Sequence, residues 1–250
     1  MYYRYVKNPD EVFSKVVINL FGKNDLSGEE QSIYQINYLI DWAKINKNTV
    51  FVDLGSHEGQ EINELAKTGC MVHAFEPNPH TFKTLSKRFK NYNNYFLNNV
   101  AASTKYTKEY FYFLKTRKYI EKDSGSLLKT DNFVHSKNFF KKLILTFFYK
   151  FFFYKIKIQS IDIVKYIDNL NSKIDILKID TEGTEYEILD HLFNTGAYKK
   201  IDKIFYEDHI RKIVHYMEPK NMNRNQLSWL KLRSSCLKKY YDANYNLYEF

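Results

Sequence analysis

The 250-residue sequence predicts an α/β fold, in which a mostly parallel central sheet carries helices on both faces and ends in an antiparallel edge strand. Short β-rich runs alternate with amphipathic helical segments, and this alternation is typical of parallel sheets, whose strands are joined by helical crossovers. Hydrophobic residues make up 44% of the chain, which is a globular composition.

The first 48 residues predict a helical extension, and residues 49–250 predict one domain that contains a basic aromatic insert at 115–155. Ser27 and Glu30 have the spacing of a capping box. An apolar series with helical period follows them. Its members are Ile33, Ile36, Leu39, Ile40 and Ala43.

A βαβ unit is predicted where the period changes. Residues 49–55 form a β-rich run, 59–69 a helix that ends at Gly69, and 70–76 a second buried strand. Asn78 then caps a helix that begins with Pro79. Further strands are predicted over 95–101, 109–114, 155–161, 174–180 and 203–207, helices over 162–170 and 185–193, and the antiparallel edge strand over 244–250.

Composition limits the compartment and the partners. Lys and Arg outnumber Asp and Glu by 38 to 29, so the surface favours acidic partners. A chain with 18% aromatic residues and excess basic charge fits nucleic-acid binding, but also an AT-rich genome, to which we give more weight. Two cysteines, Cys70 and Cys236, are too few for a disulfide framework. No signal peptide or membrane span is recognisable, so we expect a cytoplasmic protein of unknown oligomeric state.

The first chemical motif is the turn after the first predicted strand. Asp53 ends that strand, and Gly55, Ser56 and Gly59 lie in the turn before the next helix. Glycines let the backbone approach a ligand, and the helix N-terminus directs its N–H groups to the same place. The turn lacks the middle glycine of a dinucleotide-binding fingerprint, and a purely structural turn is an equal alternative.

Glu76 is the second motif, 21 residues after Gly55 at the end of the next predicted strand. An acidic residue there accepts hydrogen bonds from both hydroxyls of a ribose, and the alternative is a solvated strand-end carboxylate. No Gly-rich phosphate loop with a lysine is present, which disfavours ATP. S-adenosyl-L-methionine, which has a ribose and a sulfonium but no phosphate, suits a pocket lined by Asp53 and Glu76.

The third motif crowds charged residues around Gly183, where a predicted strand meets a helix. They are Lys178, Asp180, Glu182 and Glu185. Such carboxylates bind a ligand or ionise unequally. With the two earlier motifs and an acidic strand end at 204–209, this run resembles the FkbM-type family of S-adenosylmethionine-dependent methyltransferases. The resemblance covers about residues 48–209 and implies a Rossmann-like class I methyltransferase fold.

The resemblance also implies transfer of a methyl group to a hydroxyl oxygen, most often that of a sugar in a glycan or glycosylated metabolite. Asp180 is the first candidate for the base or acceptor-orienting group and also for the cofactor site, followed by Glu182, Glu207 and His209. Asn99 is the candidate contact to the adenine. Alternatively, Asp180, Glu182 and Glu207 hold a divalent cation, Mg²⁺ or Mn²⁺, that acidifies the hydroxyl. For Lys178 we expect a structural ion pair.

Two features depart from the family pattern. His57 stands in the turn where the family usually has Asn, and the insert at 115–155 does not map onto the family pattern and is a candidate for substrate selection. Residues 139–154 place aromatic pairs every four residues, which predicts an amphipathic helix that packs as a lid or dimer contact or, alternatively, lies in an anionic membrane interface. The β-rich composition of residues 147–158 also allows a strand there. A nucleic-acid methyltransferase, which we consider the weaker reading, and a non-catalytic binding protein are the rival functions.

Overall fold

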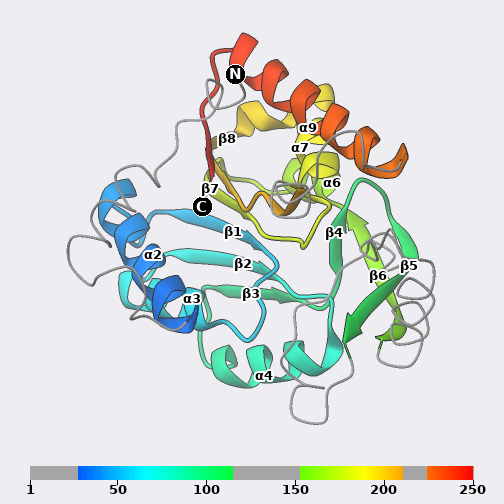
Figure 1. Ribbon diagram of the computed structural model, residues 1–250. Helices are drawn as coiled ribbons and strands as arrows, with labels where there is room; N and C mark the ends of the chain where they lie inside the picture. Colours follow the sequence, from blue (N-terminus) through cyan, green and yellow to red (C-terminus); the bar gives the residue numbers. More distant parts are fainter. Residues whose placement is uncertain (1–27, 115–152, 211–223, 250) are drawn as a thin grey trace.

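The computed structural model describes residues 28–114, 153–210 and 224–249. Its main sheet has the strand order β3-β2-β1-β7-β8-β9, and every neighbouring pair of these six strands is parallel (Figure 1). The strands are β1 (Val50–Leu54), β2 (Met71–Phe75), β3 (Tyr95–Asn98), β7 (Ile174–Ile179), β8 (Ile201–Tyr206) and β9 (Leu247–Glu249). The predicted α/β class is confirmed.

The chain winds outward from β1 in two directions. It passes through β2 and β3 on one side, and through β7, β8 and β9 on the other. The winding therefore reverses between β1 and β7, whose register pairs Phe51 with Ile176 and Leu54 with Ile179. In doubly wound sheets this reversal is the place at which ligands bind, at the carboxyl ends of the strands.

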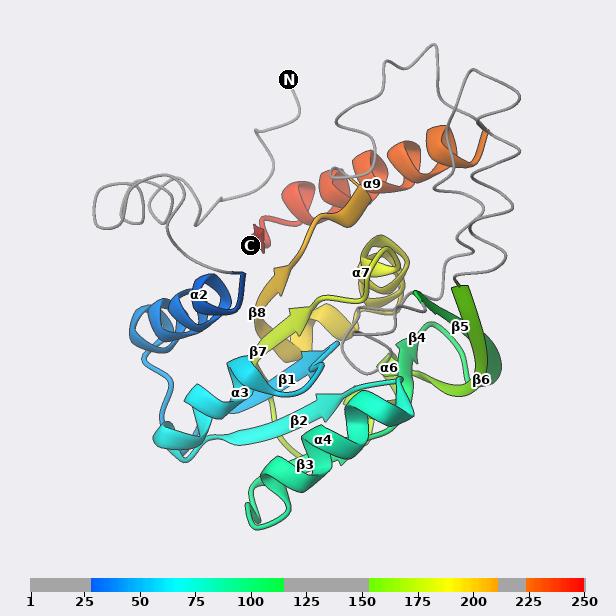
Figure 2. The ribbon, with the colours of Figure 1, turned by 60° about the horizontal axis from the view of Figure 1, so that its bottom comes forward.

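Helices cover both faces of the main sheet (Figure 2). One face is covered by α2 (Gly28–Ala43), α3 (Gln60–Leu65) and α4 (Pro79–Phe89), and a 3₁₀ turn at Ala66–Thr68 extends α3. The other face is covered by α6 (Ile163–Asp168), α7 (Glu185–Thr195) and α9 (Arg224–Asp242). Alternate strand residues divide between the two cores, because successive side chains of a strand point to opposite faces. Phe51 packs with the first group of helices, and Val52 and Leu54 with the second.

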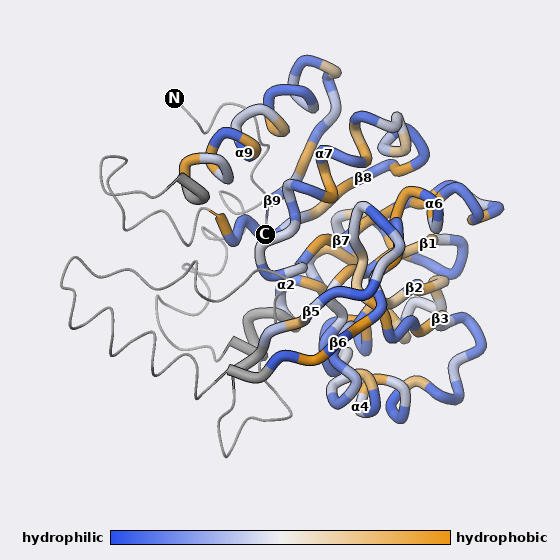
Figure 3. Tube along the Cα trace, turned by 90° about the vertical axis from the view of Figure 1, so that its right-hand side faces the viewer, coloured by the Kyte–Doolittle hydropathy of each residue, from blue (hydrophilic) through white to orange (hydrophobic). Residues whose placement is uncertain are grey.

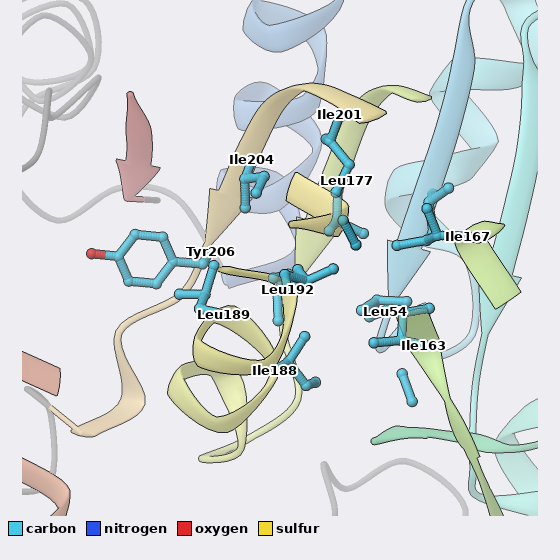
Figure 4. Close-up of a cluster of buried hydrophobic side chains, with 14 of the residues drawn as sticks. Leu54, Ile163, Ile167, Leu177, Ile188, Leu189, Leu192, Ile201, Ile204 and Tyr206 are labelled. Carbon is cyan, nitrogen blue, oxygen red and sulfur yellow. The ribbon is translucent and has the colours of Figure 1, made fainter. Parts of the chain in front are cut away.

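The strands are hydrophobic because both of their faces are buried. All five residues of β1 are buried, as expected for the centre of a parallel sheet. Figure 4 shows Leu54 and Leu177 together with Ile188 and Leu192 of α7 in one of the two cores. Figure 3 shows the hydrophobic segments concentrated around the central strands, with hydrophilic segments at the periphery.

The predicted helix ends are confirmed where they are described. Asn78 Oδ1 accepts a hydrogen bond from the backbone N–H of His80 at 3.0 Å, and Pro79 is the first residue of α4. Gly69 ends the 3₁₀ turn after α3 with a left-handed φ of 73°. Asp162 caps α6 and accepts from the N–H of Val164. These local signals correctly place the boundaries of the βαβ unit.

The predicted antiparallel edge strand is wrong. β9 pairs with β8 in parallel, with Ile204 opposite Leu247 and Tyr206 opposite Glu249. No helix is predicted between residues 210 and 243, whereas the structure has the 19-residue helix α9 there. A helical crossover returns the chain to the starting edge of the sheet, so the next strand runs parallel.

The prediction of a single strand over 95–101 is also wrong. This segment divides into β3 and β4 (Ala101–Ser103), and β4 belongs to a second sheet with the order β4-β6-β5. β5 (Thr107–Leu114) and β6 (Phe153–Asp162) pair antiparallel over eight residues. This small sheet lies beyond the carboxyl ends of β1 to β3 (Figures 1 and 2).

Two further predictions can be placed only in part. α2 confirms helix over residues 28–43, and its Ile36 and Leu39 are buried in the core. The Ser27 end of the predicted capping box and residues 139–152 of the predicted amphipathic helix lie outside the described residues, and its last two residues, Phe153 and Tyr154, belong to the strand β6 instead. Among the helices of the described ranges, none combines the length and apolar character needed to cross a bilayer.

Candidate functional site

The predicted site residues lie at the carboxyl edge of the main sheet, on both sides of the reversal between β1 and β7. Backbone hydrogen bonds continue the pattern of the sheet into the loops that carry these site residues. The N–H of Gly55 donates to Phe75 O at 2.9 Å, that of Asp180 to Leu54 O at 2.8 Å, and that of Glu207 to Ile179 O at 3.0 Å. Each loop therefore leaves its strand from a fixed position, which brings distant parts of the sequence together.

The two glycines of the turn after β1 make room for protein atoms. A Cβ on Gly55, whose φ is +99°, would lie 1.8 Å from the backbone oxygen of Asp180. A Cβ on Gly59, whose φ is +78°, would lie 2.5 Å from the Phe89 ring. The positions of both glycines in the sequence predict close approach of a ligand. The structure instead gives a packing reason for each, and contact with a cofactor remains a prediction.

Glu76 ties this turn to the loop after β2. The side chain is 5% exposed; its Oε2 accepts from the N–H of His57 at 2.9 Å and its Oε1 from the N–H of Asn78 at 2.7 Å. Burial raises the pKa of the Glu76 carboxyl to about 7, although both amide donors favour the ionised form. Asn99 Nδ2 donates to Glu76 O at 2.8 Å, so Asn99 holds the loop; its predicted adenine contact remains a prediction.

The hydroxyl of Ser56 donates to Asp53 O at 3.1 Å, which closes the turn on itself. His57 has a φ of +48° in this turn. That left-handed region favours Asn over most residues, which accounts for the Asn that the family resemblance leads us to expect there. These hydrogen bonds of the turn survive the departure, because their donors are the Ser56 hydroxyl and the backbone N–H of His57 rather than the imidazole.

A buried cation joins the two sides of the reversal. Lys178 Nζ lies 3.1 Å from Glu61 Oε2, 3.3 Å from Asp180 Oδ2 and 3.5 Å from Asp53 Oδ1. Burial alone would lower the pKa of Lys178, but these carboxylates hold it well above its ordinary value. The structural ion pairing predicted for Lys178 is confirmed. Glu61, whose pKa burial raises, was missed because it stands alone on a helix face in the sequence.

His209 is the centre of a second charged cluster, on the other side of Asp180. Its Nε2 lies 3.1 Å from Glu182 Oε2, 3.7 Å from Glu207 Oε2 and 3.9 Å from Asp180 Oδ1. Its Nδ1 lies 2.9 Å from Glu185 Oε1. Burial lowers the pKa of His209, but the hydrogen bonds to Glu182 and Glu185 outweigh it and raise this pKa to about 10. The predicted catalytic residues therefore form one cluster.

Two buried side chains hold the loops of this cluster. Glu185 is fully buried, and its Oε1 also accepts from the N–H groups of Gly183 at 2.9 Å and Thr181 at 3.1 Å. Arg233 of α9 donates through Nε to Asp208 Oδ2 at 2.7 Å, and Asp208 separates Glu207 from His209. Sequence reasoning missed the role of Arg233, because α9 was not predicted and no local pattern marks that contact.

The sequence matches a known protein family. The sequence matches the methyltransferase FkbM domain over residues 53–227, which includes every candidate residue of the site. No curated protein matches the chain.

Several solved structures show distant similarity to the chain. They include coclaurine N-methyltransferase bound to N-methylheliamine and SAH, with 18% identity, coverage of 31% of this chain and 24% of that chain, and a TM-score of 0.27. Precorrin 8w decarboxylase of Methanobacterium thermoautotrophicum has 16% identity, coverage of 69% and 59%, and a TM-score of 0.33. A Staphylococcus aureus protein provisionally described as a caffeoyl-CoA O-methyltransferase has 11% identity, coverage of 95% of this chain and 80% of that chain, and a TM-score of 0.41. The chain thus spans about a quarter of the length of the first of these proteins.

Proposed function

The chain belongs to the FkbM methyltransferase family, and from this premise we propose that it transfers the methyl group of S-adenosyl-L-methionine to a hydroxyl oxygen of a sugar or glycan acceptor. The observation that carries the proposal is the reversal between β1 and β7, where the glycine turn and the carboxylates of Glu76 and Asp180 follow neighbouring strands. This is the position at which doubly wound sheets bind nucleoside cofactors.

The residues at this edge suit the cofactor. Glu76 is a buried carboxylate whose oxygens keep acceptor capacity after two amide hydrogen bonds, so they are suited to the two hydroxyls of a ribose. Asp53 Oδ1 is buried without a hydrogen-bond partner in the described part of the chain, although Lys178 lies 3.5 Å away. A cofactor with a sulfonium and an ammonium group favours such an acidic surrounding.

Methyl transfer is an in-line displacement. The acceptor oxygen attacks the methyl carbon, the C–S bond breaks, and its electron pair returns to sulfur, which leaves a neutral thioether. The enzyme must align oxygen, carbon and sulfur, and the hydroxyl proton needs an acceptor. Asp180 is our candidate for that acceptor. Its Oδ2 faces Lys178 at 3.3 Å, and its Oδ1 faces the His209 cluster.

Side chains of the small sheet suit an acceptor that carries both a sugar and a negative charge. It lies beyond the carboxyl edge of the main sheet (Figure 1), and Tyr110 on its exposed surface is flanked by two lysines. Lys155 Nζ lies 4.7 Å and Lys157 Nζ 5.9 Å from the centre of the Tyr110 ring. Aromatic rings pack on sugar faces, while lysines attract anionic groups.

Two measurements test the proposal. Calorimetric titration should show binding of S-adenosylmethionine and its demethylated product, weakened by roughly 1–3 kcal/mol in Glu76→Ala through loss of charge-assisted hydrogen bonds. An unchanged affinity in that variant would remove Glu76 from the cofactor site. No binding by the wild type would favour a non-catalytic protein of the same fold.

Labelled-methyl transfer should then be screened over nucleotide sugars, oligosaccharides and RNA. We expect Asp180→Asn to lower turnover about 100- to 10,000-fold with little change in cofactor affinity. Asp202→Asn is the matched control, because that carboxylate is 43% exposed and pairs with surface lysines. Near-normal turnover of Asp180→Asn would contradict its role as base. Transfer to RNA alone, with strong salt dependence, would replace the sugar by nucleic acid.

A further inference from the structure

We propose that Asp180, Glu182 and His209 bind a divalent cation, and that this ion holds the acceptor hydroxyl for methyl transfer. The binding of the ion stands on the geometry of the cluster. Its role with the acceptor rests on the proposed function. The sequence suggested only oxygen ligands for such an ion; the structure adds the imidazole of His209 and brings its Nε2 to the carboxylates.

The distances fit a shared ion. One ligand atom each from Asp180, Glu182 and His209 can be chosen so that all lie within 4.8 Å of one another. His209 Nε2 is 3.1 Å from Glu182 Oε2 and 3.9 Å from Asp180 Oδ1. Ligands bonded at about 2.0–2.2 Å to one ion lie roughly 3 Å apart when adjacent and about 4.3 Å apart when opposite. Side-chain shifts of less than about 1 Å would therefore complete the site.

Glu185 supplies the second observation. It is fully buried behind the imidazole, and its Oε1 accepts from His209 Nδ1 at 2.9 Å, which leaves Nε2 directed at the other carboxylates. Histidines that bind metals almost always donate their second ring N–H to such a partner. Among the described residues, Glu185 Oε2 has no hydrogen-bond partner. A buried carboxylate with an unpaired oxygen is unfavourable, and positive charge on the ring beside it would offset that cost.

The cluster is rich in possible oxygen ligands. Four carboxylates, those of Asp180, Glu182, Glu185 and Glu207, lie within 4.0 Å of the imidazole of His209, and Asp180 also faces Lys178 at 3.3 Å. Glu207 Oε2, at 3.7 Å from Nε2, is close enough to be a fourth ligand. A mixed set of nitrogen and oxygen ligands suits Mn²⁺ better than Mg²⁺, which prefers oxygen alone.

The chemistry follows from open coordination positions. The four side chains that could contact the ion are 12–35% exposed, so a substrate oxygen can reach the same place. An ion there would bind the acceptor hydroxyl and lower its pKa, so Asp180 would act as a ligand and the hydroxyl proton would pass to water in place of Asp180. The competing arrangement has protonated His209 as the cation, hydrogen-bonded to Glu182 in place of a metal.

The test titrates Mn²⁺ into the full chain after chelator treatment and gel filtration, and follows free Mn²⁺ by electron paramagnetic resonance. We expect one ion per chain. His209→Gln and Glu182→Gln should each weaken binding roughly tenfold or more, whereas His80→Gln, which changes an exposed histidine on α4, should match the wild type. Circular dichroism identifies any variant that fails to fold. If His209→Gln does not fold, Glu182→Gln is the decisive variant, because the side chain of Glu182 is more exposed than that of His209.

Binding of S-adenosylhomocysteine to the same samples separates the two proposals. A wild type that binds this compound but no Mn²⁺ up to millimolar concentration would overturn the metal site and leave the proposed function standing. Mn²⁺ binding that survives both cluster variants would also overturn it, because the ion would then be adventitious. A wild type that binds Mn²⁺ with the expected variant pattern but no S-adenosylhomocysteine would support the site and contradict the proposed function.

Discussion

Gly59 and Gly196 allow the packing role of a glycine to be separated from its backbone role. Both have a φ of +78°, but a Cβ on Gly59 would meet the Phe89 ring at 2.5 Å and Leu85 at 2.6 Å, whereas a Cβ on Gly196 would meet nothing within 4 Å. Replacing each by alanine therefore imposes the same left-handed strain at both positions. Only Gly59→Ala also forces a methyl group against the buried side chains of Leu85 and Phe89 of α4.

The magnitude follows from these two terms. Left-handed alanine is unfavourable by about 1–2 kcal/mol, and the loss of unfolded-chain entropy offsets about 0.4–1 kcal/mol of it. Overpacking adds about 1–3 kcal/mol at Gly59 alone. We expect Gly59→Ala to be less stable than Gly196→Ala by about 1–3 kcal/mol. In a chain of this size that difference lowers the melting temperature by roughly 2–12 °C.

Thermal and urea unfolding of the two variants, both without ligand, measure the difference. Binding of S-adenosylhomocysteine is measured at a temperature at which both are folded, and we expect affinities within a few-fold of the wild type. Equal stabilities would refute the packing argument. Equal stabilities together with a large loss of affinity in Gly59→Ala would restore the original interpretation, in which this glycine makes room for the cofactor.

Three other expectations come from the charged groups and the turn. Lys178→Met should lower the free energy of unfolding by about 3–5 kcal/mol, because it leaves buried carboxylates without their cation. Lys200→Met, which removes one member of a surface ion pair, should change this free energy by less than about 1 kcal/mol. Equal losses of the two variants in urea unfolding would contradict this expectation. Ionised Glu76 accepts the ribose hydroxyls better than its protonated form, so with a pKa of about 7 the affinity for S-adenosylhomocysteine should rise about tenfold from pH 6 to pH 8. Calorimetry of Glu76→Gln, whose side chain does not titrate, should show no such rise. His57→Asn should raise the free energy of unfolding by about 0.5–1 kcal/mol, and with it the melting temperature, because Asn tolerates the φ of +48°. A lower melting temperature would show that contacts of the imidazole stabilise the fold by more than the backbone strain destabilises it.

Local sequence signals predicted the parts of the fold that local chemistry decides. The Asn78 cap, the Pro79 start and the Gly69 end are satisfied by atoms within a few residues, so the sequence places them correctly. The direction of β9 depends on the unpredicted helix α9, and α9 has a weak apolar stripe that its charged residues interrupt. Division of residues 95–103 between two sheets depends on pairing with β6, more than 50 residues later in the chain.

The candidate site shows the same distinction. Asp180, Glu182 and Glu185 are close in sequence and were recognised together. Their partners were not, because the contacts of Glu61 with Lys178 and of Arg233 with Asp208 join elements that only the folded sheet brings together. The glycines were recognised for their backbone freedom, but the atoms that fill the space of a Cβ can be identified only in three dimensions.

The pairing of β1 with β7 has a consequence for the order in which the molecule folds. Residues of β1 and β2 are about 20 positions apart and can pair early, whereas Val50 N–H and Asp175 Oδ2, which hydrogen-bond at 2.7 Å, are separated by 125 positions. Loop closure over so long a separation is entropically unfavourable, and contacts of this kind slow folding. We therefore expect two sub-structures, one with the glycine turn and Glu76 and one with the acidic cluster, to form before they dock. Neither half contains a complete site, so a chain emerging from the ribosome gains its binding chemistry only in the final docking step.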